Sequence, residues 1–201
     1  GFTQFSNAQF YEGTPLDISN PNHKASNSYI AWGNGFAVVW TQGNTIWFSR
    51  LDENGLVVQP PVAVYTPDKK LGNVWLPTVS TGGANFVTVF TIFHKGKHTL
   101  HSICIKPDGS QLGQVNTIDN TETLYRGFKP VWNGSEIGVF YFKMDPEHVL
   151  YFITLDASGV PKSSTVSIGT VNCKKILYYM DACWNGKYYG VIWNQDYRYL
   201  N

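Results

Sequence analysis

Apolar and polar residues alternate along much of this chain, and one alternating run recurs four times. Each copy starts with a large side chain, alternates through small and β-branched residues, and closes on an aromatic. The copies end at residues 40, 90, 141 and 193, and they read Phe36-Ala37-Val38-Val39-Trp40, Phe86-Val87-Thr88-Val89-Phe90, Ile137-Gly138-Val139-Phe140-Tyr141 and Tyr189-Gly190-Val191-Ile192-Trp193. Such a period predicts one supersecondary unit repeated along or around an axis.

Each copy is the middle of a longer unit. Before it stands a strand that ends in Trp and a glycine turn, as in Trp132-Asn133-Gly134. Asn-Gly between two β-runs is a strong hairpin signal, because both central residues of that turn need positive φ. A third strand, a turn with Asp and Gly, and a weaker fourth strand follow. We therefore expect meanders of four antiparallel strands, without helices.

Repeated four-stranded units of this length form the blades of a β-propeller, and an open solenoid is the alternative. The fourth unit stops after its third strand, at residues 197–201, while residues 5–19 read like a missing outer strand. Around a circle of 201 residues, Phe5 lies 51 positions after Leu155. The sequence thus predicts an all-β, four-bladed β-propeller, with the ring closed by the N-terminal strand joining the last blade.

We expect residues 1–201 to form a single domain. Its predicted blades cover about residues 27–66, 76–119, 127–169, and 179–201 together with 1–19.

The motifs Trp-Asn-Gly, aromatic-Val-Val-Trp and Leu-Asp-x-x-Gly carry a resemblance. The last occurs as Leu51-Asp52-Glu53-Asn54-Gly55. Together they resemble the repeats of bacterial secreted and surface β-propeller proteins over nearly the whole chain. Four blades also give a haemopexin-like architecture, by blade count only and without a haemopexin repeat motif. The resemblance implies a propeller fold and favours an extracellular or exported protein.

The composition fits large side chains stacked between sheets. Aromatic residues make up 15% of the chain and charged residues 14%, against about 25% charged residues in average globular proteins. A net charge of +1 gives no electrostatic case for nucleic acid, and no apolar run approaches a membrane span, so neither partner is expected. The three cysteines are too few for a disulfide scaffold; we favour buried thiols over a Cys173–Cys183 bridge.

Two sets of residues are candidates for ligand binding. Aromatics at the ends of the first strands, with the turn amides beside them, suit stacking on a sugar ring, although large side chains also wedge between blades. This set is Trp32, Trp132, Trp184, Asn133 and Asn185. Three residues before each Trp-type position lie Tyr29, Thr78, Lys129 and Asp181. We expect these at the channel mouth, where Lys129 and Asp181 form an ion pair or contribute to an ion or small-ligand site.

Other chemistry has little support in the sequence. Most acidic residues lie in turns, so no pair of carboxylates suits a glycosidase. His94, His98 and His101 are expected in a solvent-exposed polar loop rather than at a metal. No cofactor is expected, although a channel-bound ion is compatible with the fold.

Our leading hypothesis is therefore a non-enzymatic ligand-recognition module, lectin-like, that binds a carbohydrate or small ligand at the blade faces or channel mouth. A protein–protein interaction scaffold is the alternative, and a hydrolase-type propeller enzyme comes third.

Overall fold

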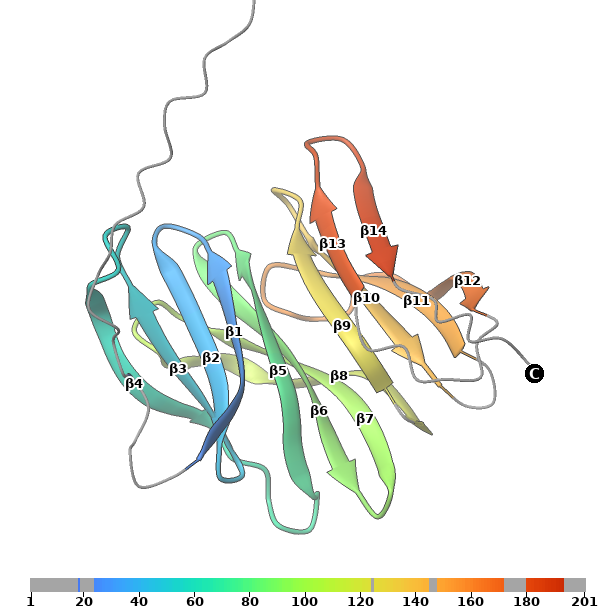
Figure 1. Cartoon of the computed structure of the whole chain (residues 1–201), viewed down its shortest axis with the longest axis horizontal. Helices are drawn as coiled ribbons and strands as arrows, with labels where there is room; N and C mark the ends of the chain where they lie inside the picture. Colours follow the sequence, from blue (N-terminus) through green and yellow to red (C-terminus); the bar gives the residue numbers. More distant parts are fainter. Residues whose placement is uncertain (1–17, 19–23, 124, 145–147, 172–179, 194–201) are drawn as a thin grey trace, which may run out of the picture.

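The computed structural model describes residues 18, 24–123, 125–144, 148–171 and 180–193. Within these ranges the chain is all-β, and its strands form antiparallel sheets that follow one another along the chain (Figure 1). This confirms the predicted class and the predicted four-stranded meander. Within the described residues, no helix is long and apolar enough to span a membrane.

Three sheets have four strands each, and the described part of the fourth has two. The first sheet contains β1 (Ala25–Trp32), β2 (Phe36–Gln42), β3 (Thr45–Leu51) and β4 (Val57–Tyr65). The second contains β5 (Asn73–Gly82), β6 (Asn85–His94), β7 (Lys97–Ile105) and β8 (Gln111–Thr123). The third contains β9 (Tyr125–Trp132), β10 (Ile137–Lys143), β11 (His148–Leu155) and β12 (Val166–Val171). The fourth contains β13 (Met180–Trp184) and β14 (Tyr189–Trp193), so every copy of the repeated run is a second strand.

The first strands of the four sheets lie side by side. β5 packs between β1 and β9, and β9 packs against β13 (Figure 1). We call β1, β5, β9 and β13 the inner strands. The first and fourth sheets share no ladder among the described strands. The strands predicted for residues 5–19 and 197–201 lie outside the described residues, so the closed ring stays a prediction.

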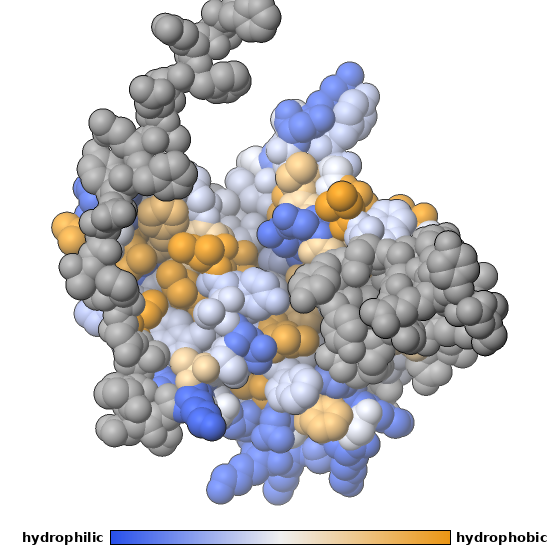
Figure 2. Space-filling view, in the orientation of Figure 1, coloured by the Kyte–Doolittle hydropathy of each residue, from blue (hydrophilic) through white to orange (hydrophobic). Residues whose placement is uncertain are grey.

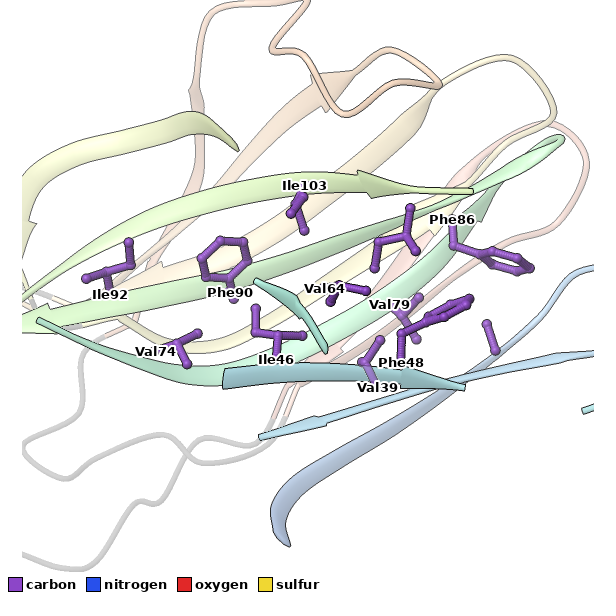
Figure 3. Packing of buried hydrophobic residues seen from close by; sticks show 12 residues of the cluster. Val39, Ile46, Phe48, Val64, Val74, Val79, Phe86, Phe90, Ile92 and Ile103 are labelled. Atoms are coloured by element: carbon purple, nitrogen blue, oxygen red, sulfur yellow. The ribbon is translucent and has the colours of Figure 1, made fainter. Parts of the chain in front are cut away.

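Neighbouring sheets pack face to face through alternate side chains. Between the first and second sheets, Phe48 and Val39 meet Phe86 and Phe90 in one buried cluster (Figure 3). On the opposite side of β6, Val87 and the residues in phase with it join a second cluster, shared with the third sheet. One strand therefore contributes to two cores, as its two-residue period requires. Each large apolar side chain buried in this way contributes about 1.5–3 kcal/mol to folding.

The contact between the third and fourth sheets depends on a glycine. Gly138 of β10 faces Tyr189 of β14, and a Cβ on Gly138 would lie 2.7 Å from a ring carbon of Tyr189 and 2.8 Å from one of Phe152. Both rings belong to the third cluster, with Phe140 and Phe142. Only a residue without a side chain fits this position.

The closing aromatics are core residues in three of the four runs. Trp40, Phe90 and Tyr141 are buried, as expected, whereas Trp193 is exposed. Trp193 is the last described residue of β14 and lies on the side of the strand that bears Tyr189 and Val191. Ile192 points to the opposite side and is 71% exposed, because no described sheet covers that side.

The Asn-Gly turns of the first and third sheets have different backbone conformations. In the first sheet, Asn34 and Gly35 both have positive φ, as predicted. In the third sheet only Gly134 has positive φ, and the side-chain oxygen of Asn133 accepts hydrogen bonds from the backbone N–H groups of Ser135 and Glu136. The expectation of two left-handed residues is therefore wrong for this turn. Asn is selected there as an acceptor for its own backbone.

Each described inner strand except β13 contains a β-bulge at the same place. The bulge contains a residue with positive φ, five residues before the Trp-type position: Asn27 (52°), Leu76 (50°) and Gly127 (55°). The corresponding position of the fourth sheet, residue 179, lies outside the described residues. The bulge is a regular part of the unit, and the sequence analysis did not find it.

The packing of Gly138 gives a first prediction. Gly138→Ala should lower the free energy of unfolding by about 1–3 kcal/mol, because the new methyl group overlaps two aromatic rings. Chemical denaturation measures the change. Gly169→Ala is the matched control, since a methyl group there enters open space in another strand of the same sheet. Equal stability of the two variants would contradict the packing described.

Candidate functional site

The polar residues predicted at the channel mouth are brought together only in part. Nζ of Lys129 on β9 lies 2.8 Å from Oδ1 of Asp181 on β13, which confirms the expected ion pair. Thr78 on β5 is buried, and its hydroxyl donates to the carbonyl of Val89. Tyr29 on β1 is exposed. The ion pair therefore joins two inner strands, while the other two positions take no described part in it.

Asp181 is held in its charged form. The hydrogen bond from Lys129 lowers the pKa of the Asp181 carboxyl, partial burial opposes this, and the backbone N–H of Ala182 at 2.9 Å lowers it further. The two side chains are 42% and 70% exposed, so this pair adds little to stability. It presents an ionised carboxylate beside an ammonium group, open to an incoming molecule.

Five other described carboxylates already have hydrogen-bond or ion-pair partners. Asp52, Asp108 and Asp156 accept backbone hydrogen bonds within their own turns. Glu136 pairs with Lys162, and Asp119 with Lys143. Among the described side chains, Asp181 is the one carboxylate on an inner strand, which makes it the best candidate for chemistry where the inner strands meet.

The predicted stacking residues occupy different environments. Trp32 is 58% exposed and meets the ring of Phe36 edge-on. Trp132 is half-buried against the second cluster, and Trp184 packs on Tyr189 at 4.7 Å. The side-chain oxygens of Asn133 and Asn185 accept hydrogen bonds within their turns. Their role in ligand binding stays a prediction.

A buried polar cluster between the second and third sheets is absent from the sequence analysis. Asp119 of β8 forms an ion pair with Lys143 of β10 and accepts a hydrogen bond from the Tyr141 hydroxyl at 3.2 Å. The backbone N–H of Thr121 also donates to it, at 2.9 Å. Burial raises the pKa of Asp119, but the bonds from Lys143, Thr121 and Tyr125 outweigh it, so the net shift is downward. The sequence contains no pattern around Asp119 that would predict its pairing with Lys143.

The histidines and cysteines differ from expectation. His98 is 3% exposed and packs against Phe93, so the exposed loop expected for the histidines is wrong for this residue. His101 faces the other side of the sheet, where burial lowers its pKa to about 4. Within the described ranges no three His, Cys, Asp or Glu residues are grouped to hold a metal ion.

Of the cysteines, Cys104 is buried, as expected, and burial raises its pKa to about 11. Cys183 is exposed, contrary to the expectation of a buried thiol, because it faces away from the third sheet. Cys173 lies outside the described residues.

The far side of the fourth sheet is hollowed. The hollow has a volume of about 290 Å³, and its lining residues are Asp181, Ala182, Cys183, Gly190, Val191 and Ile192. Apolar side chains also gather on this part of the surface and over the first sheet in Figure 2. The fourth sheet thus has one covered face and one open face.

The fold is similar to that of solved β-propellers. A subtype N10 neuraminidase-like protein of a little yellow-shouldered bat strain matches with a TM-score of 0.54 at 6% identity, over 79% of this chain and 48% of its own. A GH43 protein, BlXynB, from Bacillus licheniformis matches at 0.56 and 14% identity, over 87% and 37%. A glycosyl hydrolase from Bacteroides ovatus matches at 0.54 and 11% identity, over 89% and 64%. No family model and no curated protein matches the sequence.

At these identities the likeness shows the fold alone, and the chain spans less than two thirds of each neighbour. The neighbours are propellers of the GH43 and neuraminidase type, in agreement with the predicted propeller class. They contradict our leading hypothesis of a non-enzymatic recognition module, because they belong to glycoside hydrolase propellers, the interpretation that the sequence analysis placed third.

The buried cluster gives a second prediction. Asp119→Asn should lower the free energy of unfolding by about 3–5 kcal/mol at neutral pH, because it leaves Lys143 buried without its counter-charge. The pKa of Asp119 is depressed in the folded protein. Its stabilising effect is therefore present above its ordinary pKa of 3.8 and is lost as the pH falls through the lower folded value.

Denaturant unfolding at a series of pH values measures this effect. The difference between wild type and Asp119→Asn should shrink below about pH 4. Glu53→Gln, in an exposed turn, is the control and should stay within about 0.5 kcal/mol of wild type. A difference that does not depend on pH would contradict the assigned role.

Proposed function

We propose that this chain is a glycoside hydrolase-type β-propeller, and that Asp181 is one carboxylate of its active site. The observation that carries the proposal is the ionised Asp181 on an inner strand, held by Lys129. The propeller fold of the glycosyl hydrolase and of the GH43 protein supports it. The substrate would be a carbohydrate with a glycosidic bond to be cleaved by water.

The pKa of Asp181 selects its role. Glycoside hydrolysis uses two carboxyl groups: one protonated, which donates to the leaving oxygen, and one ionised, which attacks the sugar or activates water. A lowered pKa of the Asp181 carboxyl suits the ionised role better than that of the acid. The partner acid is not among the described inner-strand side chains, and its distance from Asp181 would decide between retention and inversion.

The third prediction tests this role. Asp181→Asn should lower the rate of hydrolysis by a factor of about 10²–10⁴, because Asn neither attacks nor accepts a proton. Chromogenic aryl glycosides of xylose, arabinose, galactose and sialic acid are the substrates to measure. Stability should hardly change, since the ion pair is exposed.

Two further variants sharpen the test. Asp108→Asn is the control, because Asp108 accepts hydrogen bonds from Ser110 in an exposed turn and Asn retains this acceptor. Lys129→Gln should move the acidic limb of the pH–rate profile to higher pH, because loss of the cation raises the pKa of Asp181. If Asp181→Asn hydrolyses every active substrate as fast as wild type, Asp181 is not catalytic.

We also propose that the fourth sheet packs on the first and closes a four-bladed ring. The first and third residues of each repeated run face the preceding sheet, while the second and fourth face the following one. Two faces are left without a described partner: Gly190 and Ile192 of the fourth sheet, and Phe36 of the first. Phe36 opposite Gly190 would repeat the fit of Tyr189 on Gly138. Closure would cover the part of the hollow lined by Gly190 and Ile192, and Asp181, on the inner strand β13, would lie nearest the axis.

The fourth prediction tests closure. Ile192→Asp should lower the free energy of unfolding by about 2 kcal/mol or more, because closure buries this position without a partner for the charge. Ile168→Asp on the outer strand β12 is the matched control and should change stability by about 0.5 kcal/mol at most. Light scattering should give a monomer at all concentrations. Equal effects of the two variants would refute closure.

A further inference from the structure

The bulge of β5 carries a residue that such backbone conformations disfavour. Asn27 and Gly127 tolerate positive φ in the other two bulges, whereas Leu76 with a φ of 50° is strained by about 1–2 kcal/mol. Strain of this kind persists only where the surrounding contacts impose it, and it is concentrated at functional sites. A bulge also redirects the side chains beside it. The residue immediately before Leu76 is Trp75, whose side chain lies next to the bulge.

The side chain of Trp75 packs on other rings on one side and is exposed to solvent on the other. Its ring stacks on Phe93 at 5.9 Å with an angle of 30°, and the ring of His98 meets it at 5.8 Å and 64°. His98 is itself buried, lies 4.8 Å from Phe93, and is 3.4 Å from the Thr91 hydroxyl through its Nδ1. Trp75 remains 42% exposed on this base. Its orientation is therefore fixed before any ligand arrives, which reduces the entropic cost of binding.

A buried hydroxyl without a partner lies on the same side of the sheet. Thr123 of β8 stands opposite His98 in the ladder, so both side chains point toward the third sheet. Thr123 is 9% exposed, and its Oγ1 has no hydrogen-bond partner. Leaving a buried hydroxyl unpaired is unfavourable, so a polar group that reached Thr123 would be bound favourably. A single exposed Trp needs no explanation, but a Trp that adjoins a strained residue and packs on a histidine paired with an unbonded hydroxyl does.

We propose that Trp75, with Thr123 next to the His98 that supports it, binds a sugar ring of the substrate. This rests on the proposed hydrolase function and adds a binding surface to it. A pyranose or furanose has an apolar C–H face that stacks on an indole, and hydroxyl groups at its edge that bind a buried Thr. The hairpin between β6 and β7 carries Lys95 and Lys97, which disfavours a cationic ligand. The sugar would thus lie toward the third sheet, where the inner strands begin.

The test measures binding with hydrolysis switched off. Asp181→Asn protein labelled with ¹⁵N is titrated with xylohexaose, arabinohexaose, cellohexaose and sialyllactose, and the indole N–H resonances are followed. The Trp75 resonance is the one missing from Trp75→Phe. We expect it to shift with at least one of these sugars. Trp75→Ala should weaken that binding at least tenfold, and Trp75→Phe, which keeps a ring, only a few-fold.

Tyr188→Ala is the matched control, because Tyr188 is more exposed than Trp75 and lies in the turn between β13 and β14, at the other end of the inner strands. It should bind the same sugar as the parent does. Thr123→Val should weaken binding and also raise the unfolding midpoint, because it removes the unpaired hydroxyl. The proposal is overturned if no sugar shifts the Trp75 resonance, or if Trp75→Ala binds like its parent. Binding without any hydrolysis by the wild type would retain this site and reject the catalytic role of Asp181.

Discussion

The face-to-face packing of neighbouring sheets is the constraint on which this molecule depends. Along β6, Phe86 and Phe90 point to the first sheet, while Val87 and Val89 point to the third. A shift of the strand by one residue would exchange the two sets and put each in the wrong core. The register of every second strand is therefore fixed from both sides at once. Residue size is fixed with it, as the contact of Gly138 with Tyr189 demonstrates.

Two ion pairs connect the third sheet to its neighbours. One is buried and has a structural role, whereas the other is exposed and is available to a ligand. Asp119 and Lys143 are buried with a tyrosine hydroxyl on the carboxylate, so the pair is satisfied internally and specifies how two sheets meet. Such a pair offers nothing to a ligand, because its polar atoms are already used. Lys129 and Asp181 join sheets in the same way but stay open to solvent. An exposed, ionised carboxylate has little structural value, and so its chemistry has to be explained.

The features that the sequence predicted correctly are those encoded by residues close together in the chain or by equivalent positions of the repeat. Alternation and turn residues are local signals, so the strand order and the second-strand role of each repeated run followed from them. Lys129 and Asp181 were paired correctly because repeated units place equivalent residues side by side. Asp119 and Lys143 are 24 residues apart at inequivalent positions, so only the packed sheets reveal them. The exposure of Cys183 depends on which sheet covers the fourth, and no local pattern encodes that.

The bulge of the inner strands shows where a repeated framework permits differences. Its backbone is the same in three sheets, with φ between 50° and 55°, yet its residues are Asn27, Leu76 and Gly127. Asn and Gly are the residues that this conformation ordinarily selects, so a leucine has to be held there by its surroundings. The ion pair follows the same rule, since two equivalent positions hold opposite charges and the other two hold a tyrosine and a buried threonine. The packing positions of a repeat stay similar because they preserve the fold. Residues that depart from the pattern, by adopting a strained backbone or by carrying a charge, are therefore the best candidates for a function.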